Sequence, residues 1–123
     1  MCRFIERSQI VMKKIVELDS IQKKFKEKVI FDSFSCTIYE NEFVAIIGKS
    51  GCGKSTLLNM IGLLDSPDSG EIILFGEKGI KPFSKKATLL LKSKIGYLFQ
   101  NFALIENKTV YENLQMAINE KNN

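Results

Sequence analysis

Residues 43–64 have the sequence FVAIIGKSGCGKSTLLNMIGLL, in which an apolar run, a glycine-rich segment and a second apolar pattern follow one another. The run Phe43–Ile47 is rich in β-branched and apolar side chains, which is typical of a strand covered on both faces in a parallel sheet. From Lys54 the apolar residues return at helical spacing, and one face of the expected helix carries Leu57, Leu58, Ile61 and Leu64. The order of strand, loop and helix predicts an α/β fold.

The glycine-rich segment Gly48–Ser55 reads GKSGCGKS and matches the pattern G-x-x-x-x-G-K-[ST]. Its glycines allow the backbone to curl until successive N–H groups face inward, which makes a concave site for an anion. The start of the following helix adds the positive end of its dipole. In this pattern Lys54 reaches the terminal phosphates and the Ser55 hydroxyl is offered to Mg²⁺. We therefore predict a site for a nucleotide phosphate.

The composition excludes several other classes of site and partner. The 123 residues contain no histidine, which rules out a serine–histidine triad, a histidine-ligated metal and a histidine proton shuttle. The net charge of +4 is too small to indicate a nucleic-acid partner. Three widely spaced cysteines form no CxxC pair, and this usage fits a reducing, cytosolic setting. No apolar run approaches the roughly 18 residues of a membrane-spanning helix, so the chain is not expected to cross a bilayer by itself.

Outside residues 43–64, the pattern predicts short strands, turns and two further helices. Ser84 is expected to cap a helix that continues through Lys94, and Thr109-x-x-Glu112 is a capping box that opens another helix. The charged run KKFKEK at 23–28 is interpreted as a turn. Period-2 alternation and short apolar runs predict strands at residues 14–21, 29–31, 34–39, 71–75 and 95–99.

Three stretches of the chain resemble the ATPases of ATP-binding cassette (ABC) transporters. SGCGKSTLL at 50–58 extends the generic pattern, and SPDSGEI at 66–72 leads into a strand as it does in that family. IGYLFQNFALIENKTVYENL at 95–114 resembles the family's Q-loop region. The resemblance covers Lys14–Met116 and looks nearest to the ATPases of lipoprotein, macrolide and bacteriocin or peptide exporters. It implies a P-loop NTPase half-domain of the α/β class, with a RecA-like core and a small antiparallel β portion at the N-terminus.

The resemblance also implies roles for individual residues. Phe25 lies where the family places an aromatic ring that stacks on adenine. Gln100 would coordinate Mg²⁺ or hold water near the terminal phosphate, and Ser55 would be the other magnesium ligand. The segment Asn101–Glu106 would face the membrane partner. The phosphates of ATP would be bound by Gly48, Ser50, Gly51, Cys52, Gly53, Lys54, Ser55 and Thr56.

The partners implied by the resemblance are a transmembrane permease and a second ATPase subunit in a head-to-tail dimer, with no nucleic acid. An ATPase of this kind is cytoplasmic and meets the inner face of the cell membrane only through the permease. The function implied is ATP binding, coupled through hydrolysis to membrane export.

Several family motifs are not found in these residues: the LSGGQ-like signature, the apolar strand that ends in Asp-Glu, and the switch histidine. We therefore expect residues 13–123 to be a truncated ABC nucleotide-binding domain, preceded at 1–12 by a tail or an over-extended start. Such a chain is expected to bind ATP weakly and to hydrolyse it negligibly. A non-catalytic remnant would carry the same residues, so that alternative stays open. A small P-loop kinase or GTPase is less favoured, because the guanine-reading motif N-K-x-D does not occur.

Overall fold

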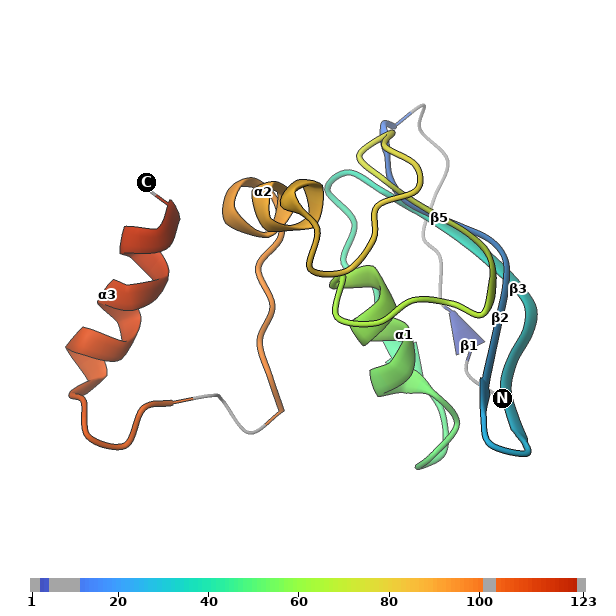
Figure 1. Ribbon diagram of the computed structural model, residues 1–123, viewed down its shortest axis with the longest axis horizontal. Helices are drawn as coiled ribbons and strands as arrows, with labels where there is room; N and C mark the ends of the chain where they lie inside the picture. Colours follow the sequence, from blue (N-terminus) through green and yellow to red (C-terminus); the bar gives the residue numbers. More distant parts are fainter. Residues whose placement is uncertain (1–2, 5–11, 101–103, 122–123) are drawn as a thin grey trace.

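The computed structural model of the chain describes residues 3–4, 12–100 and 104–121. Three strands build one sheet, and the helices lie to one side of it (Figure 1). The elements in chain order are β1 (Arg3–Phe4), β2 (Lys14–Phe25), β3 (Lys28–Tyr39), β4 (Ile46–Ile47), α1 (Lys54–Ile61), β5 (Ser69–Leu74), α2 (Lys85–Ser93) and α3 (Val110–Lys121). The glycine-rich segment thus connects β4 to α1.

β2 and β3 form a long antiparallel hairpin, and β5 joins the other edge of β2, which gives the sheet order β3-β2-β5. The turn predicted at 23–28 is wrong in extent, because only Lys26 and Glu27 form the turn. The charged residues on either side enter the strands, since backbone hydrogen bonds between strands form whatever the side chain carries. For the same reason the two short strands predicted at 29–31 and 34–39 are one continuous strand.

Two predicted strands are shortened or missing. Phe43–Ile47 yields only β4, which pairs antiparallel with β1, and the Phe43 side chain is 97% exposed. Residues 95–99 form no strand. Both stretches have strand-forming side chains, but a strand also needs a neighbouring backbone to share its hydrogen bonds. Within the described residues every strand pair is antiparallel, so the parallel pairing expected for Phe43–Ile47 is not observed there.

One hydrophobic core joins the sheet to α1 and α2. The helix α1 contributes Leu57 and Met60, which are fully buried, whereas Leu58 is 47% exposed. The predicted helix face was therefore right for Leu57 and wrong for Leu58. α1 also ends at Ile61, short of the predicted Leu64, because the chain turns at Gly62. The core consists of Val16, Leu18, Ile21, Phe31, Leu57, Met60, Leu63, Leu74, Ala87 and Leu90.

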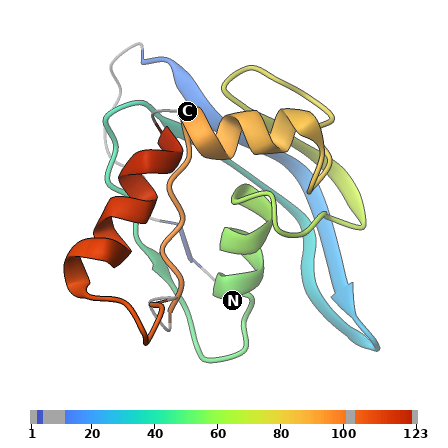
Figure 2. The ribbon, with the colours of Figure 1, turned by 60° about the vertical axis from the view of Figure 1, so that its left-hand side comes forward.

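Both predicted helix caps are confirmed. At the start of α2, Ser84 Oγ accepts a hydrogen bond from Ala87 N at 3.2 Å. At the start of α3, Thr109 Oγ1 accepts from Glu112 N at 3.2 Å and Glu112 Oε2 accepts from Thr109 N at 2.8 Å. These reciprocal bonds define a capping box. α3 lies beyond α2, away from the sheet (Figures 1 and 2), and its exposed apolar side chains include Val110, Leu114 and Ile118.

Most of the tail predicted at 1–12 lies outside the described residues, but Arg3 and Phe4 pair with Ile47 and Ile46. Residues 3–4 thus reach the strand that precedes the glycine-rich segment. No helix among the described residues has the length and apolarity that a bilayer crossing requires.

Candidate nucleotide-binding site

The segment between β4 and α1 turns through two glycines with positive φ. Gly51 has a φ of 77° and Gly53 a φ of 110°, a region that other residues rarely adopt. Gly53 is also the N-cap of α1, where no side chain caps the helix and no acidic residue lies in the first turn. The first N–H groups of α1 therefore remain for another acceptor, at the positive end of the helix dipole. This geometry suits an anion.

The Lys54 ammonium lies against the carbonyls of this loop. Its Nζ donates to Gly48 O at 2.7 Å and to Lys49 O at 2.8 Å, and it lies 3.8 Å from Cys52 Sγ. The two carbonyl acceptors are uncharged, and a phosphate oxygen would form a stronger, charge-assisted hydrogen bond. An anion in the loop would therefore compete favourably with the carbonyls for the Lys54 ammonium.

The strand β3 packs against the same loop. A Cβ on Gly53 would come within 2.4 Å of Ile30 Cγ2 and 3.1 Å of the Phe31 ring. Lys28 Nζ donates to Gly51 O at 3.0 Å. The sequence alone did not single out Lys28, although strand periodicity places Lys28 and Ile30 on one face and gives a signal for it. The sheet thus holds the loop on one side and brings a second cation to it.

Phe25 ends β2 and lies directly opposite Lys28 in the hairpin. The Phe25 side chain is 51% exposed, so part of its ring is accessible. Because Lys28 also contacts Gly51, the hairpin places Phe25 one strand away from the glycine-rich loop. A cleft of about 660 Å³ lies beside β3 and the loop and is lined by residues 28–35 and 49–52. Ser50, Gly51 and Cys52 line this cleft, and Phe25 does not.

Ser55 and Gln100 line a second cleft of about 500 Å³, together with Asn59, Tyr97 and Phe99. Tyr97 OH donates to Asn59 Oδ1 at 2.6 Å. The Tyr97 ring also packs against Gly62, where a Cβ would come within 2.5 Å of it. These contacts attach the segment that ends at Gln100 to α1, although the segment forms no strand. The structure therefore brings the two predicted magnesium ligands to one cleft.

The remaining predicted residues are placed as follows. Thr56 is half-buried in the first turn of α1. The segment Asn101–Glu106, predicted to face a membrane partner, begins with residues 101–103, which lie outside the described residues; Leu104 and Ile105 are exposed. Within the described ranges, no three Asp, Glu, His or Cys side chains gather as a metal-binding group.

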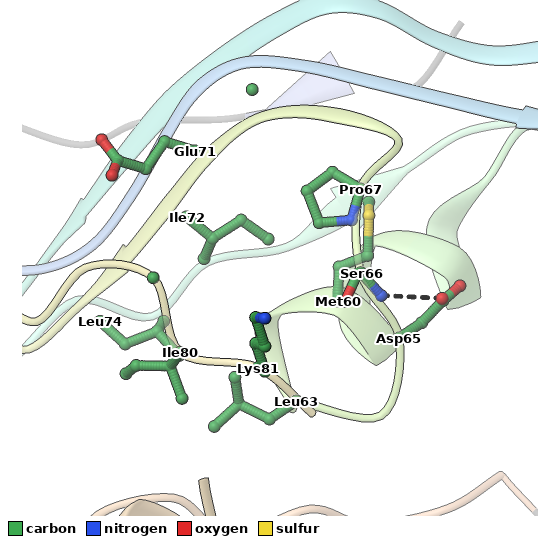
Figure 3. Close-up of a pocket in the computed structure, with 12 residues that line it drawn as sticks. Met60, Leu63, Asp65, Ser66, Pro67, Glu71, Ile72, Leu74, Ile80 and Lys81 are labelled. Atoms are coloured by element: carbon green, nitrogen blue, oxygen red, sulfur yellow. Dashed lines mark hydrogen bonds between the residues drawn. The ribbon is translucent and has the colours of Figure 1, made fainter. Parts of the chain in front are cut away.

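A separate pocket of about 270 Å³ lies at the opposite end of α1 from the glycine-rich loop (Figure 3). Its lining combines apolar side chains, among them Met60 and Leu63, with the charged Asp65 and Lys81. No predicted nucleotide-binding residue lines this pocket. It is therefore distinct from the candidate site.

Comparison with known proteins agrees with this geometry. The sequence matches the family described as "ABC transporter" over residues 31–123. It is 39% identical over 104 residues to the "Methionine import ATP-binding protein MetN" of Legionella pneumophila (strain Paris), a match that covers 85% of this chain and 30% of MetN. The "Dimeric Structure of MJ0796, a Bacterial ABC Transporter Cassette" is similar with a TM-score of 0.78 and 36% identity, over 87% of this chain and 48% of that chain. A structure of MJ0796 in a post-hydrolysis state bound to ADP and Pi has a TM-score of 0.77 and 37% identity over the same shares of the two chains.

The fold is that of the P-loop NTPase class. Within that class, the chain belongs to the ABC transporter ATP-binding family, because the family match covers residues 31–123. The chain spans about a third of the length of MetN and about half of the length of the MJ0796 cassette.

Proposed function

We propose that this chain binds Mg-ATP through residues 48–56 and forms the nucleotide-binding part of an ABC transporter ATPase. The observation that carries the proposal is the Lys54 ammonium, held on two loop carbonyls where two left-handed glycines lead into an uncapped helix. A loop of this shape offers backbone N–H groups, a helix dipole and a cation to one anion. The similarity to a relative solved with ADP and Pi supports a nucleotide as that anion.

The proposal assigns a part to each residue of the loop and to Phe25 on β2. Lys54 would bind the terminal phosphates, and Thr56 would bind phosphate from the first turn of α1. Phe25, half-exposed at the end of β2, would stack on the adenine. The backbone amides that surround the phosphates would come from Gly48, Ser50, Gly51, Cys52 and Gly53.

The residues of the second cleft fit a magnesium ion. A hydroxyl and an amide oxygen are hard donors, and Mg²⁺ is usually held by one or two protein ligands together with phosphates and water. Ser55 and Gln100 line the same cleft, so they would hold the ion next to the phosphate loop. When bound, the ion neutralises negative charge on the phosphates. Gln100 would in addition orient a water near the terminal phosphate.

The assembly we propose contains a transmembrane permease and a second ATPase subunit, arranged head to tail, on the inner face of the membrane. The dimeric state of the similar MJ0796 cassette supports the pairing. MetN is named for methionine import, so the export direction expected from the sequence finds no support in that relative. We therefore propose coupling to transport without assigning its direction.

The test is calorimetric titration of Mg-ATP into the chain, with K54M compared to K86M. Both substitutions remove one positive charge, but Lys86 is exposed on α2, away from the loop. Loss of charge-assisted hydrogen bonds to phosphate should weaken ATP binding about 10- to 100-fold in K54M. K86M should bind as tightly as the unsubstituted chain. Equal affinities for K54M and K86M, or no heat with the unsubstituted chain, would contradict the proposal.

A further inference from the structure

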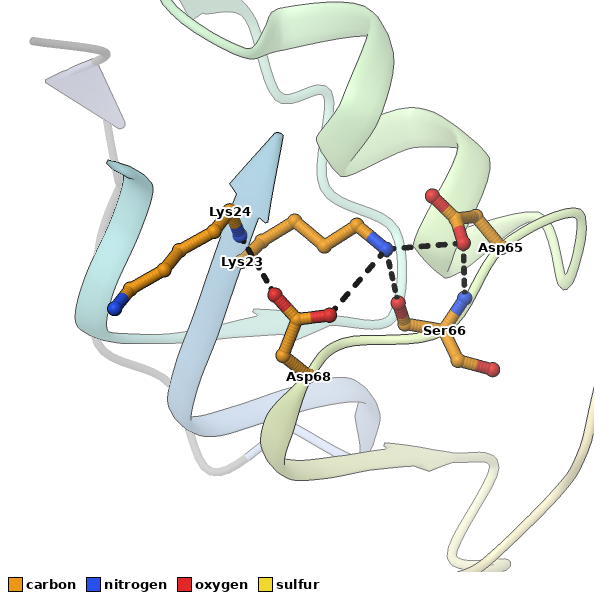
Figure 4. A network of polar contacts seen from close by, with 5 residues as sticks. All are labelled: Lys23, Lys24, Asp65, Ser66 and Asp68. Atoms are coloured by element: carbon orange, nitrogen blue, oxygen red, sulfur yellow. Dashed lines mark hydrogen bonds and ion pairs between the residues drawn. The ribbon is translucent and has the colours of Figure 1, made fainter. Parts of the chain in front are cut away.

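Lys23 is the one charged side chain that is buried within the described residues, with 8% of its surface exposed. Its Nζ donates to Ser66 O at 2.7 Å and to Asp65 Oδ1 at 3.1 Å, and lies 3.9 Å from Asp68 Oδ1. Figure 4 shows these partners gathered around the ammonium in the turn between α1 and β5. A buried ammonium needs such acceptors to compensate for its lost hydration. The network therefore ties β2 firmly to this turn.

The network lies where β2 loses one of its two neighbouring strands. The last pair between β2 and β5 is Gln22 with Ser69. At Gln22 itself, the carbonyl oxygen accepts a hydrogen bond from Asp68 N at 2.8 Å. Two residues further along β2, Lys24 N donates to Asp68 Oδ2 at 2.7 Å. The turn at 65–68 therefore takes the place of a neighbouring strand along the last residues of β2, which end at Phe25.

The Lys23 ammonium also lies over the ring of Phe25, with Nζ 5.5 Å from the ring centroid. A cation in this position is attracted by the negative face of the ring, which restrains the orientation of the ring. The cation lies over the ring, and about half of the Phe25 side chain stays exposed to a flat ligand. Phe25 is half-exposed, so packing alone holds its ring loosely, and the interaction with Lys23 further restrains the orientation of the ring.

We infer that Lys23 is a positioning residue for the adenine base, an inference that rests on the proposed function. Lys23 does not touch the nucleotide; it fixes the Phe25 ring relative to α1. That helix carries the phosphate loop at its start and is followed by the 65–68 turn at its other end. One helix therefore sets the spacing between the ring that would stack on the base and the loop that would bind the phosphates.

The experiment compares Mg-ATP with Mg-tripolyphosphate, which has the phosphates and no base. K23M removes the ammonium and keeps an unbranched chain. K24M removes the same charge from an exposed neighbour that contacts Asp68 only through its backbone N–H, and Figure 4 shows its side chain leading away from the network. K23M should weaken ATP binding about three- to tenfold, as expected for a lost cation–π contact and a less ordered ring. Tripolyphosphate binding by K23M, and both affinities of K24M, should stay unchanged.

A double-mutant cycle tests whether Lys23 acts through the ring. In an F25A background, K23M should cause no further loss of ATP affinity, because the group that Lys23 positions is absent. If K23M does not fold, the double variant D65N/D68N replaces it. That variant keeps Lys23 and the shape of both partners, and it should lower the ratio of ATP to tripolyphosphate affinity.

Three results would overturn the inference: equal ATP affinities for K23M and K24M, a parallel fall in ATP and tripolyphosphate binding, or additive losses in the cycle with F25A. Failure of the proposed function looks different, because the unsubstituted chain would then bind neither ligand. The two ideas can thus fail separately.

Discussion

The glycine-rich loop and the segment that ends at Gln100 both meet α1, but they are held there in different ways. The loop is fixed by its own glycines, by the Lys54 ammonium on its carbonyls and by β3 packed on Gly53. The segment 95–100 has no strand partner in the described part of the chain. It is attached to α1 by the Tyr97–Asn59 hydrogen bond and by the Tyr97 ring against Gly62.

This difference shows that the two halves of the candidate site depend on different kinds of interaction. The loop geometry is largely local, since the hydrogen bonds of the Lys54 ammonium join residues at most six positions apart, and Lys28 adds one longer-range contact to Gly51 O. The position of Gln100 depends on a hydrogen bond between residues 38 positions apart. Disturbing the loop should therefore affect the folded core, whereas disturbing the segment should release it and leave the core intact.

The largest effect is expected from G53A. The new Cβ would lie 2.4 Å from Ile30 Cγ2. The alanine would also have to adopt the backbone φ of 110° that Gly53 has. Steric overlap and backbone strain together should lower the free energy of unfolding by about 3 kcal/mol. The measurement is the midpoint of urea unfolding. The control is G76A, which also has a positive φ, of 78°, but no atom within 4 Å of its Cβ, and should lose only about 1 kcal/mol. Equal losses would show that β3 does not brace the loop.

A smaller and local effect is expected from Y97F, which removes the donor to Asn59 Oδ1. Leaving Asn59 Oδ1 without its donor costs about 1 kcal/mol. The fraction of molecules in which residues 95–100 are detached from α1 should therefore increase about fivefold. The measurement is the rate of limited tryptic cleavage after Lys94, where the segment begins. Y111F is the control, because Tyr111 is 70% exposed on α3. Equal cleavage rates for Y97F and Y111F would contradict the idea that the Tyr97–Asn59 hydrogen bond attaches the segment to α1.

The smallest effect concerns the capping box of α3. Hydrogen bonds from the Thr109 backbone N–H, and then from its hydroxyl, lower the pKa of Glu112 from its usual value. A lowered pKa means that the stabilisation is present above the ordinary glutamate range and is lost as the pH falls through the folded-state pKa. Carboxyl carbon NMR should show this low midpoint, and T109A should move it part of the way back. An unchanged midpoint in T109A would show that the hydroxyl has no part in the shift.

Sequence patterns predicted those features that arise within a few residues. The segment Gly48–Ser55 leads into a helix that begins at Lys54 as expected. The caps at Ser84 and Thr109 form as predicted. Longer-range features were missed. The burial of Lys23 and the contact of Lys28 with the loop were not predicted, because both residues belong to a run that resembles a solvated turn. Their hydrogen-bond partners lie 23 to 43 positions away in the chain.

The amino-acid sequence by itself determined the glycine-rich loop, the start of α1 and the helix caps, because glycine conformations and hydrogen bonds over a few residues are set by neighbouring side chains. The tertiary structure alone decided that Phe43–Ala45 and residues 95–99 are not strands, that Lys23 joins β2 to the turn after α1, and that Ser55 and Gln100 share a cleft. Strand pairing, burial and cleft formation require partners from distant parts of the chain, and only the folded core brings those partners together.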